Sequence, residues 1–456
     1  MRPSRLGSVL TLFILLAALT PEEGYDLLST VLAGKPAERA AAVRRLAAAR
    51  DLSLVPGMVD TLFFTPKADR EPLVEVLRKL TGEDAGPRYY DWVELVGRRS
   101  DLKPAPGYLA WKGALFARID PKYRQVLDPN APVRLRLEEI VWGGVPLDGI
   151  PSLDDPPRVP AAKARSLMDQ ERVFAISLGG EHRAYPLRYL SWHEMLNDTV
   201  GGQPLTLSNC TLCGTGIAYS SRLPDGTRHT FGTSGLLYRS NKLMFDRETL
   251  TLWSNLTGEA VLGKLADRPF RLEILPMTLT TWGEWKILHP DTTVVELDAA
   301  YGAKWGYRYL PGAADQRRAG VSFPVWAKSR LLPERAEIYG LRQGDRAKAW
   351  PVERVLRERV VNDRLGDLEL VLVGNPESGA VRAYRRDGRT FRAGSLPGEL
   401  RDEADRTWKV TEEALVPRVE GAAPLPRVPG HVALWFGWFG FFPQTELAGP
   451  AIGSSP

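Results

Sequence analysis

One stretch of the chain repeats itself, and this repeat constrains the possible fold more than any other feature of the sequence. The segment "RAYPLRYLSWHEMLNDTVGGQPLTLSNCTLCGTGIAY" (183–219) aligns without a gap on "KAWPVERVLRERVVNDRLGDLELVLVGNPESGAVRAY" (348–384), at a constant offset of 165 residues. Ten residues are identical at this offset: Ala184, Pro186, Asn197, Asp198, Gly201, Leu205, Leu207, Gly214, Ala218 and Tyr219. So many matches in one register predict two tandem copies of one domain.

The similarity continues beyond the ungapped segment and indicates the fold class. "TTWGEWKILHPDT" aligns with "ALWFGWFGFFPQT", which pairs Trp282 and Trp285 with two tryptophans of the later segment. Each copy has short strand-like runs, one early helix and frequent turns, a pattern that favours a mainly antiparallel sheet. The sequence therefore predicts an α+β fold with two tandem copies of a mainly antiparallel β domain, at 171–300 and 336–447.

A helical segment is predicted ahead of these copies. "PAERAAAVRRLAAAR" and "REPLVEVLRKLTG" repeat apolar residues at helical spacing, and Leu46 and Leu80 lie in similar contexts. This pattern predicts a small all-α, HEAT-like segment over 22–100. Residues 101–170 are rich in Pro and Gly, so we expect an irregular connecting arm there.

The N-terminus resembles an export signal. Arg2 and Arg5 precede an apolar run from Leu6 to Leu19, which is typical of a secretory signal peptide. An uncleaved membrane anchor is the alternative, although the run is shorter than the roughly 20 residues of a spanning helix. We expect residues 1–20 to direct the protein to the periplasm or another extracytoplasmic location, in a soluble or a membrane-anchored form.

Charge and composition exclude some classes of partner. The chain has 60 Lys and Arg against 55 Asp and Glu, a net charge of +5, and the basic residues are spread along the sequence. Because no dense basic and aromatic stripe is present, we expect no nucleic-acid partner. We also expect no nucleotide cofactor. The expected partner is a protein or a small molecule.

The repeat also distinguishes residues that the fold requires from residues that can carry chemistry. Cys210 and Cys213 are the only two cysteines, and the second copy has Asn and Ser at their places. His193, on the early helix, is replaced by Glu in the second copy. Because these three groups disappear together, we predict that the first copy carries a functional site and the second is a support or a degenerate copy.

The spacing of the two cysteines allows three interpretations. A Cys-x-x-Cys-Gly turn between strands is typical of metal-binding knuckles, and His193 would be the third ligand of a zinc or copper site. A redox-active dithiol is the second interpretation, although no helix follows the pair as in thioredoxin-like proteins. A structural disulfide in a non-catalytic binding or scaffold module is the third. Haem attachment is excluded because Gly214, and not His, follows the second cysteine.

Further residues are weaker candidates for metal ligation or for the wall of a pocket beside the cysteines. They carry carboxylate, imidazole, thioether, phenol, guanidinium or amide groups within or shortly after the first copy's motif. They are Glu194, His229, Tyr238, Arg239, Asn241, Met244 and Asp246. Whether the protein is an enzyme stays open at this point.

Several of these motifs together resemble a known family. "AYPLRYLSWHEMLNDTVGG", "NCTLCGTGIAY", "FGTSGLLYRSNKLMFDR" and "LWSNLTGEAV" are similar, in this order, to the bacterial and archaeal domain of unknown function numbered 3179. The family's motif reads Cys-Pro-Leu-Cys, and Thr211 stands here in place of the Pro. The resemblance implies an exported or membrane-tethered protein centred on the cysteine pair and the His of "WHEMLND", but it supplies no reaction.

Overall fold

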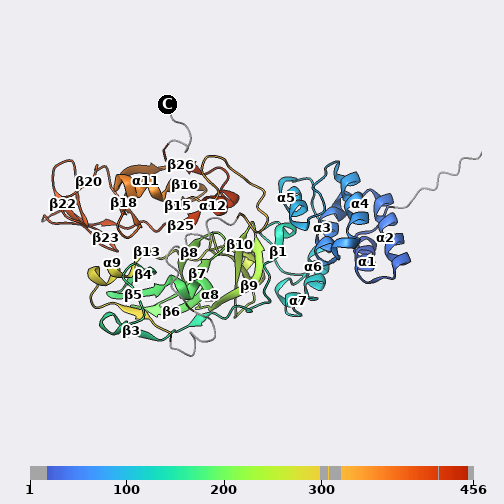
Figure 1. Ribbon diagram of the computed structural model, residues 1–456, viewed down its shortest axis with the longest axis horizontal. Coiled ribbons are helices and arrows are strands. Elements are labelled where there is room, and N and C mark those ends of the chain that lie inside the picture. Colours follow the sequence, from blue (N-terminus) through green and yellow to red (C-terminus); the bar gives the residue numbers. More distant parts are fainter. Residues whose placement is uncertain (1–17, 298–306, 308–319, 420, 450–456) are drawn as a thin grey trace, which may run out of the picture. The chain divides into compact units, whose positions relative to one another are not determined.

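The computed structural model describes residues 18–297, 307, 320–419 and 421–449, whose elements are labelled in Figure 1. The predicted signal or anchor lies almost wholly outside the described residues, so it stays a prediction. The chain divides into two compact units, Met1–Lys112 and Gly113–Pro456. Among the described helices, none is both long and apolar enough to cross a membrane.

The first unit is helical, as the sequence predicts. A capping box in which Thr20 and Glu23 exchange hydrogen bonds begins the first helix. Gly82, with a φ of 71°, ends the fourth. Neighbouring helices pack through buried aliphatic side chains such as Leu28 and Leu77. The helices are α1 (Pro21–Ala33), α2 (Pro36–Ala49), α3 (Val55–Phe64), α4 (Glu71–Thr81), α5 (Tyr89–Arg98) and α6 (Tyr108–Phe116), the last of which crosses the division between the units. The HEAT-like character of this array stays a prediction.

The second unit begins with three sheets. Their strand orders are β13-β4-β5-β14-β3, β2-β6-β7-β8 and β1-β9-β10-β11-β12. The elements after the arm are β4 (Arg172–Leu178), β5 (Glu181–Pro186), α8 (Leu187–His193), β6 (Met195–Val200), β7 (Gln203–Cys210), β8 (Thr215–Ser220), β9 (Phe231–Tyr238), β10 (Asn241–Asp246), β11 (Leu252–Ser254), β12 (Ala260–Leu262), β13 (Thr278–Thr281), α9 (Trp282–Leu288) and β14 (Thr293–Val295).

Residues 101–170 are more ordered than the expected irregular arm. Helix α6 and helix α7 (Tyr123–Val126) form in this segment, because its prolines leave "YLAWKGALF" uninterrupted. Three short strands follow: β1 (Ile140–Trp142), β2 (Leu153–Asp154) and β3 (Arg158–Pro160). Each joins a different one of the three sheets, by pairing with β9, β6 and β14 respectively. The arm is thus an integral edge of the second unit.

Three more sheets follow in the second half of this unit. Their orders are β25-β15-β16-β26, β17-β18-β19 and β20-β21-β22-β23-β24. The elements are β15 (Glu337–Gln343), β16 (Arg346–Pro351), α11 (Val352–Glu358), β17 (Val360–Leu365), β18 (Leu368–Asn375), β19 (Ala380–Arg385), β20 (Arg392–Ala393), β21 (Glu399–Arg401), β22 (Thr407–Val410), β23 (Ala414–Pro417), β24 (Leu425–Pro426), β25 (His431–Leu434), α12 (Trp435–Phe441) and β26 (Glu446–Leu447). The fold is therefore mixed α+β with mostly antiparallel pairing.

The two halves use the same element order, except that β24 has no counterpart strand in the first half, and their first strand pairs have the same register. Val173 pairs with Pro186 across β4 and β5, and Ile338 pairs with Pro351 across β15 and β16. A late parallel strand, β14 or β26, then joins β5 or β16. The tryptophan pairs agree as well: Trp285 Nε1 donates to the Thr292 hydroxyl at 2.8 Å, and Trp438 Nε1 donates to the Thr445 hydroxyl at 2.9 Å.

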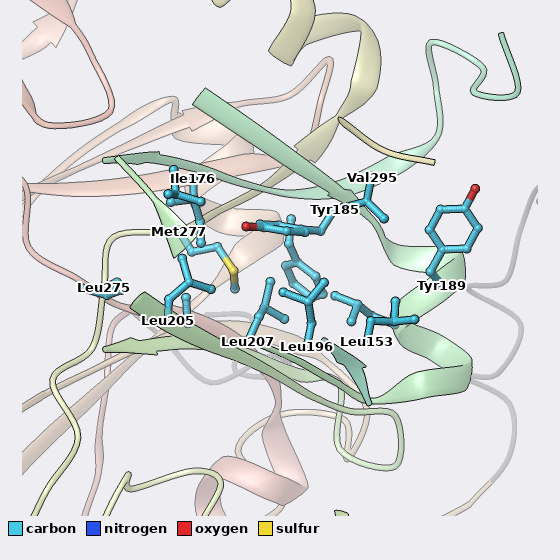
Figure 2. Close-up of a cluster of buried hydrophobic side chains, with 14 of the residues drawn as sticks. Leu153, Ile176, Tyr185, Tyr189, Leu196, Leu205, Leu207, Leu275, Met277 and Val295 are labelled. Atoms are coloured by element: carbon cyan, nitrogen blue, oxygen red, sulfur yellow. The ribbon is translucent and has the colours of Figure 1, made fainter. Parts of the chain in front are cut away.

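Apolar side chains fill the space between the first two sheets. Figure 2 shows Ile176 and Tyr185 from β4 and β5 facing Leu196, Leu205 and Leu207 from β6 and β7. These side chains are almost fully buried. Burial of apolar surface contributes roughly 25 cal/mol per Å², so this layer stabilises the fixed packing of the two sheets.

Two adjacent polar residues of β6 connect the three sheets of the first half. Asp198 accepts hydrogen bonds from Arg183 at 2.7 Å and from the Tyr185 hydroxyl at 2.9 Å, both from β5. On the opposite face, Asn197 donates to the Phe231 carbonyl at 2.9 Å and accepts from its N–H at 3.0 Å, which joins β6 to β9. Successive side chains of a strand point to opposite faces, so the Asn-Asp pair reaches both neighbouring sheets.

The second half repeats these contacts. Asp363 accepts from Lys348 at 2.8 Å and from Trp350 Nε1 at 2.7 Å. Asn362 donates to the Phe391 carbonyl at 2.7 Å and accepts from its N–H at 2.8 Å. Both copies therefore have Asn and Asp at these positions because the two side chains form the hydrogen bonds that join neighbouring sheets. In the first half, α8 ends before this pair, at His193, because Glu194 adopts a left-handed φ of 57° and starts the turn into β6.

We expect Asn197→Ala to destabilise the protein by about 2 kcal/mol, because both backbone groups of Phe231 would lose their buried partner. Chemical denaturation followed by circular dichroism measures this change. Asn130→Ala is the matched control, since Asn130 lies in an exposed turn, and its effect should stay within about 0.5 kcal/mol. Equal stabilities of the two variants would contradict the role assigned to Asn197.

Candidate functional site

The two cysteines lie in a tight hairpin between β7 and β8. Cys210 is the last residue of β7 and pairs with Thr215, the first residue of β8. Gly214 closes the turn with a φ of +60°, a conformation that favours glycine. Both cysteines are free thiols and fully buried. The hairpin therefore holds two sulfurs close to each other and away from bulk water.

Hydrogen-bond donors surround the Cys213 sulfur. Asn241, the first residue of β10, directs its side-chain N–H to Cys213 Sγ at 2.8 Å. The Asn255 amide donates to the Asn241 carbonyl oxygen at 3.0 Å, which fixes the orientation of the Asn241 amide. The Thr215 hydroxyl lies 3.1 Å from the same sulfur. Of the weaker candidates predicted from sequence, Asn241 is thus in direct contact with a cysteine.

The second half of the unit covers this sulfur. The Leu434 N–H, at the end of β25, donates to the Cys213 carbonyl at 2.9 Å. Gly437 of α12 packs so closely that a Cβ there would lie 2.7 Å from Cys213 Cβ. Val325 and Phe436 join the two cysteines in one apolar cluster. The second half therefore shields the dithiol of the first.

A buried ammonium group lies beneath the hairpin. Lys242 of β10 is 4% exposed, and its Nζ donates to the backbone carbonyls of Glu194 at 2.7 Å and Asn209 at 3.0 Å. The Glu194 carboxylate lies 3.6 Å from Nζ and accepts a hydrogen bond from the Thr211 hydroxyl at 3.0 Å. Burial lowers the pKa of Lys242, while the charges of Glu194 and the two cysteines oppose that change. Glu194, also predicted from sequence, belongs to this site.

These surroundings distinguish the two thiols. Burial raises the pKa of Cys213 well above its ordinary value of 9.0, and its interaction with Cys210 raises it further. Burial also opposes ionisation of Cys210, but a hydrogen bond from the Cys213 thiol and the charge of Lys242 act the other way. The pKa of Cys210 is consequently lowered, against an additional opposing effect of Glu194. The pair is therefore asymmetric, and Cys210 ionises before Cys213.

A small cavity of about 100 Å³ lies against Cys210. Its polar wall contains Cys210, Thr211, Glu194 and Lys242. The remaining lining comes from the hairpin, the arm, β9 and β10: Leu212 from the hairpin, Gly143, Val145 and Ile150 from the arm, Thr233, Gly235, Leu236 and Leu237 from β9, and Leu243 from β10. A molecule of only a few non-hydrogen atoms fits beside Cys210.

His193 does not join the cysteines. Its Nδ1 lies 2.8 Å from the Pro151 carbonyl, and its Nε2 contacts the Tyr307 hydroxyl. Across the described part of the chain, only one group of three or more His, Cys, Asp or Glu residues has ligand atoms within 4.8 Å of one another, and it contains neither the cysteines nor His193. The predicted Cys210, Cys213 and His193 ligand set is thus not assembled in this structure.

The group that could hold a metal ion consists of His229, Asp246 and Glu248. His229 Nδ1 lies 3.1 Å from Asp246 and 3.7 Å from Glu248. Both carboxylates already accept hydrogen bonds, from Trp253 Nε1 at 2.8 Å and from the Thr230 N–H at 3.0 Å respectively.

The second half contains the same two carboxylate contacts without a histidine. Trp408 Nε1 donates to Asp402 at 3.0 Å, and the Thr390 N–H donates to Glu403 at 2.8 Å. Arg389 precedes Thr390 where His229 precedes Thr230. The two carboxylates therefore have a scaffold role that does not depend on a metal.

The remaining candidates lie in structural roles. Arg239 pairs with Glu139 at 2.8 Å, and its guanidinium lies 4.9 Å from the Tyr238 ring centroid and 5.0 Å from that of Trp326. Met244 is fully buried in the apolar cluster around Trp253. Lys242 was not predicted from the sequence; its signal is a Lys directly before the apolar run "LMF" of the strand "NKLMFD".

We expect Cys210 to react with iodoacetamide at lower pH than Cys213, because a lowered pKa populates the thiolate at lower pH. Mass spectrometry of peptides from the chain labelled across pH 5 to about 10 separates the two sites. In Cys213→Ala the midpoint for Cys210 should move up by about one pH unit, which corresponds to a roughly tenfold slower reaction below the midpoint. Earlier ionisation of Cys213 would contradict the assignment.

Comparison with known proteins agrees with the resemblance seen in the sequence motifs. A family model described as "Protein of unknown function (DUF3179)" matches residues 147–445. No curated protein and no solved structure matches the chain. The matched region begins in the arm and includes Glu194, Cys210, Cys213, Asn241 and Lys242. The chain therefore belongs to DUF3179, a family of proteins of unknown function.

Proposed function

We propose that Cys210 and Cys213 form a two-electron redox dithiol that reduces a small peroxide. The observation that carries this proposal is the position of Cys210, which is hydrogen-bonded to Cys213, is influenced by the charge of the buried Lys242 ammonium, and lines a cavity. A thiolate is the reactive form of cysteine, and nearby positive charge stabilises it. A second thiol within reach allows the oxidised first cysteine to be resolved as a disulfide.

The surroundings of the sulfurs favour thiol chemistry over zinc or copper binding. A structural zinc site needs four ligands, and a catalytic one needs three from the protein. Among the described residues, no histidine or carboxylate group completes such a set with the two cysteines. The N–H of Asn241 and the ammonium of Lys242 present positive charge toward this site, which stabilises an anion and repels a cation. We propose that the cysteines act without a resident metal.

The reaction balances with the two thiols and one peroxide. The Cys210 thiolate attacks one peroxide oxygen, the O–O bond breaks, and Cys210 becomes a sulfenic acid while the leaving oxygen takes up a proton. The Cys213 sulfur then attacks the Cys210 sulfur, and the released hydroxide combines with the Cys213 proton to form water. The two thiols lose two electrons as a disulfide, and the peroxide ROOH is reduced to ROH and water.

The size of the oxidant follows from access to the sulfur. Both cysteines are fully buried, and the cavity beside Cys210 measures about 100 Å³. A disulfide on the surface of another protein does not fit into such a space, whereas hydrogen peroxide or a short alkyl hydroperoxide does. Exposed redox dithiols exchange with protein partners, so the burial of this pair points to a small-molecule substrate.

We also infer that the two halves of the second unit arose by duplication, in the predicted copies 171–300 and 336–447. The repeated strand register, the Asn-Asp contacts and the paired tryptophans support this history. In this proposal the first copy keeps the thiols and the second shields them. Export to the periplasm or another extracytoplasmic location remains part of the proposal and rests on the basic and apolar N-terminal segment.

We expect hydrogen peroxide to convert the reduced chain to a species with a Cys210–Cys213 disulfide, which stopped-flow tryptophan fluorescence and intact mass can follow. Lys242→Met should slow this oxidation at neutral pH roughly tenfold, because the thiolate would lose its neighbouring charge. Lys264→Met is the matched control, since Lys264 is exposed and far from the hairpin in sequence. In Cys213→Ser the oxidation should stop at the Cys210 sulfenic acid, which dimedone traps.

Three results would count against this proposal. Equal rates in the two lysine variants would remove Lys242 from the chemistry. Faster reaction with a bulky aryl hydroperoxide than with hydrogen peroxide would contradict the limit on substrate size. Stoichiometric zinc or copper in the purified chain, lost in Cys210→Ser, would replace the redox assignment by a metal site.

A further inference from the structure

The second half contains a much larger cavity at the position that corresponds to the cysteine site. It measures about 630 Å³, which lies within the range of roughly 300–1,000 Å³ typical of small-molecule sites. Asn375 and Ser378 line it, and these residues stand where the first half has Cys210 and Cys213. The cavity is therefore a counterpart of the thiol site without its sulfur chemistry.

The backbone around the two cavities is built in the same way. Arg359 ends α11 with a φ of 61°, and Glu194 ends α8 with a φ of 57°. The Gly374 N–H donates to the Arg359 carbonyl at 2.8 Å, and the Asn209 N–H donates to the Glu194 carbonyl at 2.8 Å. The second half thus keeps the frame of the site and replaces its reactive side chains.

Shortening of one strand pair explains the difference in volume. In the first half, β9 and β10 have 8 and 6 residues and supply much of the lining of the small cavity. Their counterparts in the second half, β20 and β21, have only 2 and 3 residues. The loop between them, from Gly394 to Gly398, lines the large cavity together with the adjacent strand ends Ala393, Glu399 and Leu400. The shorter pair leaves open the space that β10 and its Lys242 fill in the first half.

The buried charged side chains at the large cavity form ion pairs that neutralise one another. Arg382 and Glu412, each 5% exposed, are paired at 2.8 Å, and Arg427 also pairs with Glu412. Glu284 of α9 lies 3.8 Å from Arg382 and accepts a hydrogen bond from Asn375 at 2.8 Å. These two arginines, of which only Arg382 lines the cavity, thus face two glutamates. The other charged lining residues are Arg359 and Glu377, which are exposed, and Glu399, which pairs with Arg418 at 2.8 Å. Opposite charges therefore balance around the cavity, which favours an uncharged ligand.

Apolar side chains lie exposed at the same cavity. Ile287, Leu288 and Leu396 are 75%, 49% and 61% exposed, and all three line it. They come from two separate segments, α9 and the loop before β21. Large apolar side chains gathered around a hollow with a few convergent polar groups are typical of a site for an organic ligand.

We propose that this cavity binds an uncharged amphipathic small molecule without reacting with it. The apolar body of the ligand covers Ile287, Leu288 and Leu396, and its polar end hydrogen-bonds to the amide of Asn375 and the Arg382–Glu284 pair. This site is separate from the dithiol. The chain thus has one site for thiol chemistry and, at the corresponding position of the second half, another site for non-covalent binding.

Titration of the full chain with Nile red, an uncharged apolar fluorophore, tests this proposal. We expect saturable binding with one site per chain. Leu396→Glu should weaken it by about tenfold or more, because a buried carboxylate would face the apolar body of the probe. Ala393→Trp, which fills the cavity without adding charge, should have a similar effect. Leu331→Glu is the matched control, since Leu331 is 44% exposed but does not line the cavity.

Circular dichroism and the iodoacetamide reactivity of Cys210 report whether each variant keeps its fold. Cys210→Ser should bind Nile red as the unaltered chain does, so failure of the redox proposal and failure of this one are distinguishable. Tighter binding of an anionic fluorophore such as anilinonaphthalene sulfonate would overturn the assignment of an uncharged ligand. Absence of saturable binding, or equal losses in Leu396→Glu and Leu331→Glu, would overturn the site itself.

Discussion

The architecture of the second unit depends on one strand that carries an Asn-Asp pair. Asp198 holds β5 through Arg183 and Tyr185, and Asn197 holds the backbone of Phe231 in β9. Because the two side chains leave the strand on opposite faces, a single dipeptide positions the sheets on both sides of it. The cysteine hairpin extends from the sheet in the middle, and Lys242 reaches it from the neighbouring sheet. The geometry of the site thus follows from how these sheets are held.

The two halves show which parts of the site serve the fold and which serve chemistry. Both halves build the left-handed residue after the helix, and both tie its carbonyl to the N–H that precedes the hairpin. The second half does so without cysteines. It also has Gly398 in place of a lysine when Asp246 and Asp402 are aligned. A buried ammonium is costly in free energy unless it is paired and hydrogen-bonded. Because only the first half has this buried ammonium, we infer that Lys242 acts on the thiols and is not needed to form the turn.

Much of the fold could be predicted from the sequence because the repeated segments contain local patterns of apolar residues, turns and tryptophans. The short strand-like runs predicted a mainly antiparallel sheet, and the paired tryptophans matched the two segments that form α9 and α12. Strand β6 was not predicted, because Asn197 and Asp198 are polar residues, and nothing in the sequence shows that both are buried between sheets. The strands of the arm were also missed, because runs of two or three residues acquire their structure from the sheet they join.

The candidate site was predictable only in part. The loss of the cysteines in the second copy pointed to Cys210 and Cys213. Of the weaker candidates, Glu194 lines the cavity beside Cys210 and Asn241 contacts Cys213. The same argument selected His193, yet its ring nitrogens face Pro151 and Tyr307, residues distant in sequence whose contacts no local pattern reveals. Lys242 was missed for the same reason, since its importance comes from the carbonyls that surround it in three dimensions.

The central claim is that the cysteine pair is a redox dithiol and not a metal centre. Crystals of the purified chain, grown without chelators and then treated with hydrogen peroxide, test it through anomalous scattering at the zinc and copper edges together with the density at the hairpin. The account predicts no metal peak at the hairpin and continuous density between Cys210 Sγ and Cys213 Sγ after oxidation. An anomalous peak bonded to both sulfurs at the roughly 2.3 Å of a zinc–thiolate bond would contradict it.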